Sequence, residues 1–149
     1  MEKYIGAKLI EAEPAYRIDG KIYVKSKPVP RSMHREDGYK VVYPDGYVSW
    51  SPKEVFEEAY RRADNMSFGL AIEAAKKGKR IQRAGWNGKN QYVELATRIS
   101  YTRADGCLVN AEHADIGNKA LAFVGTSGVQ LGWLASQADM LADDWRIVE

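Results

Sequence analysis

The feature that most constrains the fold is a hairpin in the first half of the chain. Two runs rich in Tyr and Val, residues 39–43 and 47–50, flank the tripeptide Pro44-Asp45-Gly46. Proline fixes φ and glycine tolerates positive φ, so this tripeptide predicts a tight turn between two antiparallel strands. The aromatic residues of the hairpin (Tyr39, Tyr43, Tyr47 and Trp50) are expected to pack, because cross-strand aromatic pairs stabilise sheets.

A helix is predicted directly after the hairpin. Ser51 is a good N-cap, Pro52 suits the first helical position, and Glu54 would complete a capping box. An apolar stripe continues the helix as far as Arg62. Before the hairpin, residues 8–13 are strand-like up to Pro14, and residues 26–38 resemble a loop.

The second half of the chain has its own pattern of elements. Residues 67–77 have helical apolar spacing and are followed by Gly78 as a C-cap. Strands are expected at residues 79–83, 91–96, 120–124, 129–133 and 145–148, with a short capped turn at Ser136. The absence of βαβ alternation favours an α+β fold, with small antiparallel sheets and one main helix in each segment. The expected domains are residues 1–63 and 66–149.

Composition and motifs exclude several classes of protein. The chain has 149 residues, 45% hydrophobic and 28% charged, as in ordinary globular proteins. Neither a bilayer-spanning run nor a secretory signal pattern is found, so a cytoplasmic location is expected. A single cysteine, Cys107, excludes an intramolecular disulfide, and Cys and His lack zinc-site spacing. No GxSxG, HExxH, P-loop or dinucleotide-binding motif occurs, so we expect no catalytic residue, cofactor or metal.

Charge is distributed unevenly along the chain. Residues 1–74 are neutral overall, residues 75–103 carry +7, and residues 104–149 carry −5, within a total of +2. The positive block could attract phosphate. Alternatively, it is a solvated face that the acidic block partly neutralises.

A glycine-flanked loop at residues 85–89 is the first candidate binding site. Two glycines permit close backbone approach, and Trp86 offers a flat face on which a base could stack. Asn87 can donate and accept hydrogen bonds beside Gly88, and Lys89 supplies positive charge for phosphate. The alternative is an Asn-Gly turn whose tryptophan anchors the core.

A second candidate site spans residues 133–141. Within it lie a tryptophan, hydrogen-bonding side chains suited to a ribose or a base edge, and an adaptable methionine: Trp133, Ser136, Gln137, Asp139 and Met140. The alternative is a helix cap from Ser136 to Asp139 with Trp133 in the core. The two interpretations are compatible, because a capped turn also presents backbone N–H groups.

Residues 66–149 resemble a known family. The similarity rests on MSFGLAIEA at residues 66–74, GK at 78–79, GWNGK at 85–89 and WLASQADMLADDW at 133–145. These motifs, in this order, resemble the second Thoeris anti-defence family of phage proteins. Free-standing members begin at about Met66. The first segment resembles a small module of other phage proteins.

The resemblance implies a homotetrameric sponge with an α+β protomer. Family members bind cyclic ADP-ribose isomers between subunits, tightly and without altering them, and some also bind cyclic dinucleotides. Carried onto this chain, Trp86 would stack on a ring, while Asn87 and the Gly88 backbone would bond the ligand. Ser136, Gln137 and Asp139 would hold ribose or base edges. The ligand would be captured in the cytoplasm of the infected host.

Other functions remain open from the sequence. An enzyme could degrade a cyclic dinucleotide or related signal with His113 or Asp139 as a base, and would release a changed product. A nucleic-acid-binding module could use the basic block at residues 75–103, although no nucleic-acid motif is present and the following residues are acidic. A structural role in the virion is a further alternative.

Overall fold

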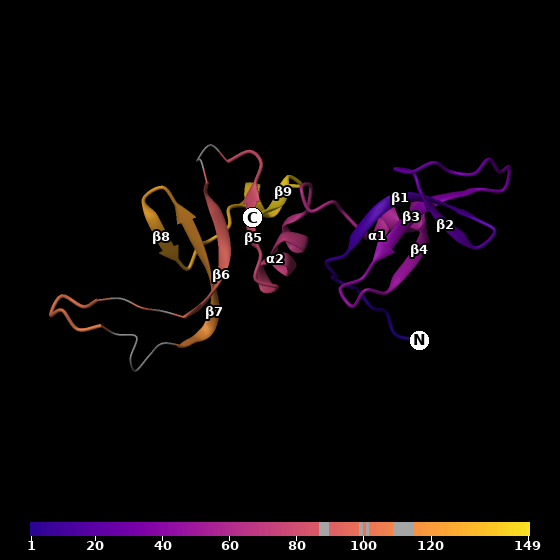
Figure 1. The fold of residues 1–149 in the computed structure, drawn as a ribbon. Helices are drawn as coiled ribbons and strands as arrows, with labels where there is room; N and C mark the ends of the chain where they lie inside the picture. Colours follow the sequence, from indigo (N-terminus) through magenta and orange to yellow (C-terminus); the bar gives the residue numbers. More distant parts are fainter. Residues whose placement is uncertain (87–89, 99, 101, 109–114) are drawn as a thin grey trace. The chain divides into compact units, whose positions relative to one another are not determined.

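A computed structural model describes residues 1–86, 90–98, 100, 102–108 and 115–149. The chain divides into two compact units, Met1–Arg61 and Arg62–Glu149. Each unit is an antiparallel sheet, with one short helix in the first unit and two in the second (Figure 1). The predicted α+β class is therefore confirmed. None of the helices that the structure describes is long and apolar enough to cross a membrane.

The first unit is a four-stranded sheet followed by one helix. Its strands lie in the order β2-β1-β3-β4, and every neighbouring pair is antiparallel. The predicted hairpin is confirmed as β3 and β4. The bounds are β1 Glu11–Ile18, β2 Lys21–Val24, β3 Glu36–Val42, β4 Val48–Pro52 and α1 Lys53–Ala59.

Sequence reasoning missed the hairpin between β1 and β2. Asp19 and Gly20 both have positive φ, 48° and 78°. This conformation suits the two-residue type I′ turn that Asp-Gly favours. The predicted end of the first strand at Pro14 was also wrong, because β1 runs through it. The Pro14 carbonyl accepts from the Lys25 N–H, just beyond the end of β2. The N–H and C=O of one residue point to the same neighbouring strand, so the missing proline N–H also lies on the β2 side and costs no bond to β3.

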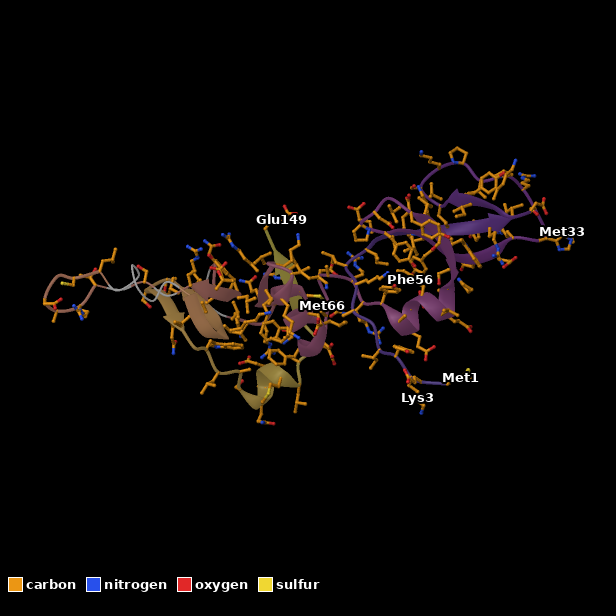
Figure 2. The ribbon with its side chains drawn as sticks, turned by 90° about the horizontal axis from the view of Figure 1, so that it is seen from below. Met1, Lys3, Met33, Phe56, Met66 and Glu149 are labelled. Atoms are coloured by element: carbon orange, nitrogen blue, oxygen red, sulfur yellow. The ribbon has the colours of Figure 1, made fainter. Side chains whose placement is uncertain are left out.

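The predicted N-cap of α1 was wrong. Ser51 belongs to β4, and Pro52 occupies the cap position without a side-chain hydrogen bond. What holds the helix is aromatic packing: the Tyr39 and Phe56 rings stack with centroids 4.1 Å apart. Phe56 also stacks on Tyr60 at 5.0 Å, and the Tyr39 hydroxyl donates to Glu57 at 2.9 Å. The expected packing role of Tyr39 is confirmed, and Figure 2 labels Phe56 on the helix.

The second unit is a five-stranded antiparallel sheet in the order β8-β7-β6-β5-β9. Helix α2 packs on β5, β6 and β9, and it lies beside these strands in Figure 1. The bounds are α2 Phe68–Lys76, β5 Arg80–Arg83, β6 Tyr92–Arg98, β7 Asp115–Gly125, β8 Gly128–Leu131, α3 Gln137–Met140 and β9 Trp145–Val148.

The core of this unit lies between α2 and the sheet. The helix is placed as predicted: the Ser67 hydroxyl accepts from the Leu70 N–H, and Gly78 follows with φ 82°. Small alanines on its buried face let it approach the strands closely. The buried residues are Met66, Ala71, Ala74, Ala75, Ile81, Val93 and Trp145.

Candidate functional site

The indole of Trp86 is held in a cluster of aromatic rings. Its centroid lies 5.4 Å from that of Trp145, 5.6 Å from Phe123 and 6.0 Å from Trp133, each in an edge-on arrangement. Such edge contacts match the charge distribution of aromatic rings. Trp86 is half-buried and packs against the core. Trp86 therefore anchors the core, which was the alternative interpretation of this loop. Its partial exposure also leaves ring surface on which a ligand could stack.

Asp139 connects this cluster to the turn that precedes α3. Trp86 Nε1 donates to Asp139 Oδ1 at 3.4 Å. The predicted cap is confirmed as a reciprocal capping box: the Asp139 N–H donates to Ser136 Oγ, and the Ser136 N–H donates to Asp139 Oδ2, both at 3.1 Å. The Asp139 carbonyl also accepts from Trp145 Nε1 at 2.8 Å. One aspartate thus holds two tryptophans and the start of α3.

Arg83, which sequence reasoning missed, bridges two carboxylates from the last part of the chain. Its Nη1 lies 3.0 Å from Asp139 Oδ1, and its Nε lies 2.9 Å from Asp144 Oδ1. Asp144 Oδ2 also accepts from the Gly85 N–H at 3.1 Å. A Cβ on Gly85 would lie 3.3 Å from that oxygen, so glycine suits this close approach. The sequence signal for this network was the basic block at residues 75–103 followed by the acidic block at residues 104–149. That signal does not indicate which residues form pairs.

The electrostatics keep both carboxylates ionised. Burial acts to raise the pKa of Asp139, but hydrogen bonds from Ser136, Arg83 and Trp86 outweigh it and hold that pKa below its usual value. The hydrogen bond from Arg83 is the main cause of the lowered pKa of Asp144, against an opposing effect of burial. A carboxylate with a lowered pKa is a weak base at neutral pH, so the arrangement favours hydrogen bonding over proton abstraction by Asp139.

The structure brings some of the predicted site residues together. Trp86, Trp133, Ser136 and Asp139 form one continuous group, although their positions are about fifty residues apart in the chain. Two others lie on α3 with exposed side chains that make no hydrogen bond within the part described: Gln137 and Met140, the latter 39% exposed. The remaining predicted residues, Asn87, Gly88 and Lys89, lie outside the described residues. Ligand contact by all of these residues stays a prediction.

The basic block is partly neutralised within its own unit. Besides Arg83, ion pairs join Lys76 to Glu73 at 2.8 Å, Arg80 to Glu94 at 3.6 Å and Arg103 to Asp105 at 3.3 Å. These pairs reduce the field available to a polyanion. Over the described ranges, no group of three or more His, Cys, Asp or Glu side chains is placed to hold a metal ion. Cys107 is exposed and unpaired with another cysteine, and His113 lies beyond the described ranges.

Fold and site together define a small α+β domain in which an ion-pair network holds an aromatic cluster against a capped turn. Residues 66–148 match the sequence model of the Thoeris anti-defense 2-like domain. The chain is also 38% identical to Thoeris anti-defense 2 of Bacillus phage SP01 over 88 residues, which are 56% of this chain and 94% of that protein. The chain therefore belongs to the Thoeris anti-defense 2-like family, as the resemblance predicted. Membership supports a phage function directed against Thoeris defence.

Proposed function

We propose that this protein is a non-enzymatic sponge for a cyclic ADP-ribose-type second messenger. In this proposal it acts in the cytoplasm of the infected bacterium and blocks Thoeris defence. The observation that carries the proposal is the bond from Trp86 to Asp139, because it joins an aromatic stacking surface to hydrogen-bonding groups. Family membership supplies the biological context.

The groups at the site suit a nucleotide. The exposed part of the Trp86 ring would stack on adenine, which is worth about 1–3 kcal/mol. Ser136 Oγ accepts from the Asp139 N–H, so its own proton is available to a ribose oxygen. Gln137 would donate or accept, and Met140 would add apolar contact beside it. The remaining polar groups of the ligand would be bound by three residues of the predicted loop at residues 85–89, namely Asn87, Gly88 and Lys89.

Rigidity of the site supports tight capture. A sponge has to compete with the effector, and nanomolar binding corresponds to about −12 kcal/mol. The ion pairs of Arg83 and the edge contacts of Trp86 hold the binding groups before the ligand arrives. Less ordering is then needed on binding, which favours affinity. The same network engages the carboxylate of Asp139 in hydrogen bonds, which disfavours its use as a base. This agrees with a ligand that is released chemically unchanged.

The proposal includes self-association into a tetramer with sites between subunits. The strand register pairs Val124 with Val129 and Ala122 with Leu131. Their neighbours in β7, Leu121 and Phe123, pack against the core, so these two pairs lie on the opposite face of the sheet. On this face Val129 is 68% exposed and Leu131 41% exposed. Apolar side chains gathered on one face are typical of protein contacts. Sedimentation of the full chain would give the mass of the assembly, and a monomer at micromolar concentration would contradict this part of the proposal.

The test of sequestration uses glycocyclic ADP-ribose and purified protein. After free ligand is removed, the protein is heated and the released material is identified by chromatography. Intact ligand is the expected result. A modified product would make the protein an enzyme and overturn the proposal. Failure to retain any cyclic ADP-ribose isomer would also overturn it, and cyclic dinucleotides would then be tested in the same way.

Variants of Trp86 separate stacking from packing. Trp86→Ala removes a ring that contacts three others, so it is expected to lower stability as well as affinity. Trp86→Phe keeps an aromatic face but loses the bond to Asp139. We expect it to remain folded with about 1 kcal/mol less stability, because that bond lies within the protein, and to bind more weakly because a smaller ring stacks on the base. Unchanged affinity in both variants would remove Trp86 from the site.

A further inference from the structure

The first unit, which lies outside the matched family domain, carries an alternating row of cations and an aromatic ring. Strand β2 is an edge strand. Residues two apart in a strand share one face, so Lys21 and Tyr23 lie together, and Lys25 continues the same row just beyond the strand. The register pairs Tyr23 with Tyr16 of β1, which places a second ring on this face.

Tyr16 gathers two of the cations. The Lys25 ammonium lies 4.4 Å from the centroid of its ring, and the Arg35 guanidinium lies 4.7 Å from it. Attraction between a cation and the face of a ring holds both charges near the sheet. Asp37 pairs with Lys25 at 2.5 Å, so part of this charge is balanced. Tyr23 is half-buried and takes part in no ring or cation contact within the described chain, so its exposed ring surface is available for stacking.

The chain segment that contains Tyr23 and the loop after β2 carries side-chain charge of one sign, although Asp37 of β3 lies opposite Tyr16. Residues 20–35 contain no acidic side chain and five basic ones, Lys21, Lys25, Lys27, Arg31 and Arg35. In the part of the chain described, Lys21, Lys27 and Arg31 have no acidic partner. The average over residues 1–74 concealed this cluster, because acids elsewhere in the unit, including three on α1, cancel it.

The cluster also lies on the open part of the sheet face. Helix α1 packs on β3 and β4, which covers the half of the face that contains Tyr39. The Tyr16–Tyr23 half lies on β1 and β2, beside the loop of residues 25–35. Met33, 96% exposed, marks the tip of this loop in Figure 2, well away from Phe56 on α1.

We propose that this cationic tyrosine surface, formed by Tyr16, Tyr23, Lys21, Lys25, Lys27, Arg31 and Arg35, binds single-stranded nucleic acid. A base would stack on Tyr23, and phosphates would pair with the basic side chains around it. Proteins that bind single strands without sequence preference combine aromatic side chains, on which bases stack, with cations that pair with the phosphates. The surface belongs to the unit outside the family domain, so the proposal is independent of the sponge function.

The test is fluorescence anisotropy of a labelled 12-nucleotide oligothymidine titrated with the full-length protein. Tyr23→Ala should weaken binding about 5- to 100-fold by loss of stacking, and Tyr23→Phe should restore it. Lys27→Gln with Arg31→Gln should weaken binding and reduce the slope of log affinity against log salt by about 1.4, two phosphate contacts at about 0.7 each.

A matched variant in the second unit controls for general charge. Lys77→Gln with Lys79→Gln removes two exposed cations of the basic block, and affinity should stay within about twofold. The proposal is overturned if the wild type does not bind, or if this control weakens binding as much as the first-unit pair. It is equally overturned if duplex of the same length binds as tightly, since its bases are not exposed. Displacement by adenosine monophosphate at equal nucleotide concentration would show a mononucleotide site instead.

Discussion

Arg83 Nη1 donates to Asp139 Oδ1 at 3.0 Å, and this ion pair fixes strand β5 to the capped turn at the start of α3. The two side chains are only 21% and 14% exposed. Charged hydrogen bonds with this degree of shielding are stronger than those at an open surface. The pair also determines where Trp86 is held, because both side chains that donate to Oδ1 converge on the same oxygen.

Asp139→Asn is expected to lower the free energy of unfolding by about 1–2 kcal/mol. The amide keeps the shape of the carboxylate but loses the charge that faces Arg83. Solvent partly screens this charge, which reduces the loss of stability. Urea unfolding followed by tryptophan fluorescence measures it, since three of the four tryptophans lie in this unit. Asp143→Asn is the matched control, because Asp143 is exposed. Equal losses in both variants would contradict the role of the ion pair.

Stability should fall in acid through Asp139 and Asp144. Both have a folded-state pKa below the usual value, so the unfolded chain binds protons first as the pH falls. Their contribution is therefore complete at neutral pH and is lost as the pH falls from about 4 through the lowered folded values. Urea midpoints measured between pH 7 and pH 3 should decline less steeply for Asp139→Asn with Asp144→Asn. Parallel curves for variant and wild type would refute this.

The two serine caps offer a matched pair of substitutions. Ser136 Oγ accepts from the Asp139 N–H at 3.1 Å, and Ser67 Oγ accepts from the Leu70 N–H at 3.4 Å. Replacing either with alanine should cost about 1 kcal/mol of stability. Only Ser136→Ala should also weaken retention of glycocyclic ADP-ribose, since Ser67 caps the helix on the core side. Calorimetric titration of both variants provides the comparison, and equal affinity loss would argue against a ligand contact by Ser136.

Gly38 is needed for the packing of the first unit. A Cβ at this position would overlap the main-chain oxygen of Ser51 and lie 2.8 Å from the ring of Trp50. The Arg17 guanidinium also lies over the Trp50 ring, 4.0 Å from its centroid, so a second contact holds the indole in place. Gly38→Ala should destabilise the unit by about 1–3 kcal/mol.

Limited proteolysis with mapping of the cleavage sites would locate this effect in residues 1–61. Gly6→Ala is the control, because nothing lies within 4 Å of the added carbon. A Gly38 variant as resistant to protease as this control would show that strand β4 adjusts without cost. Cleavage confined to the second unit would show that the substitution acts elsewhere.

Local patterns in the sequence determined much of the fold. The hairpin around residues 44–46, helix α2 and the capping box at Ser136 each depend on residues a few positions apart, so turn chemistry and apolar period predicted them. The errors were also local in origin. Ser51 is a good cap residue, yet pairing with Tyr39 extends β4 through it, because tertiary pairing overrides a local preference.

The sequence by itself determined the α+β class and the family, and it predicted part of the candidate site, including Trp86, Trp133, Ser136 and Asp139. Only the tertiary structure decided how those residues act together. Arg83 and Asp139 are 56 positions apart, and no local pattern relates residues at such a distance. Their pairing follows from strand order, which places β5 beside β9 and so brings Asp144 and Asp139 into contact with Gly85 and Trp86. That order is settled by which apolar faces can be buried together, a property of the whole chain.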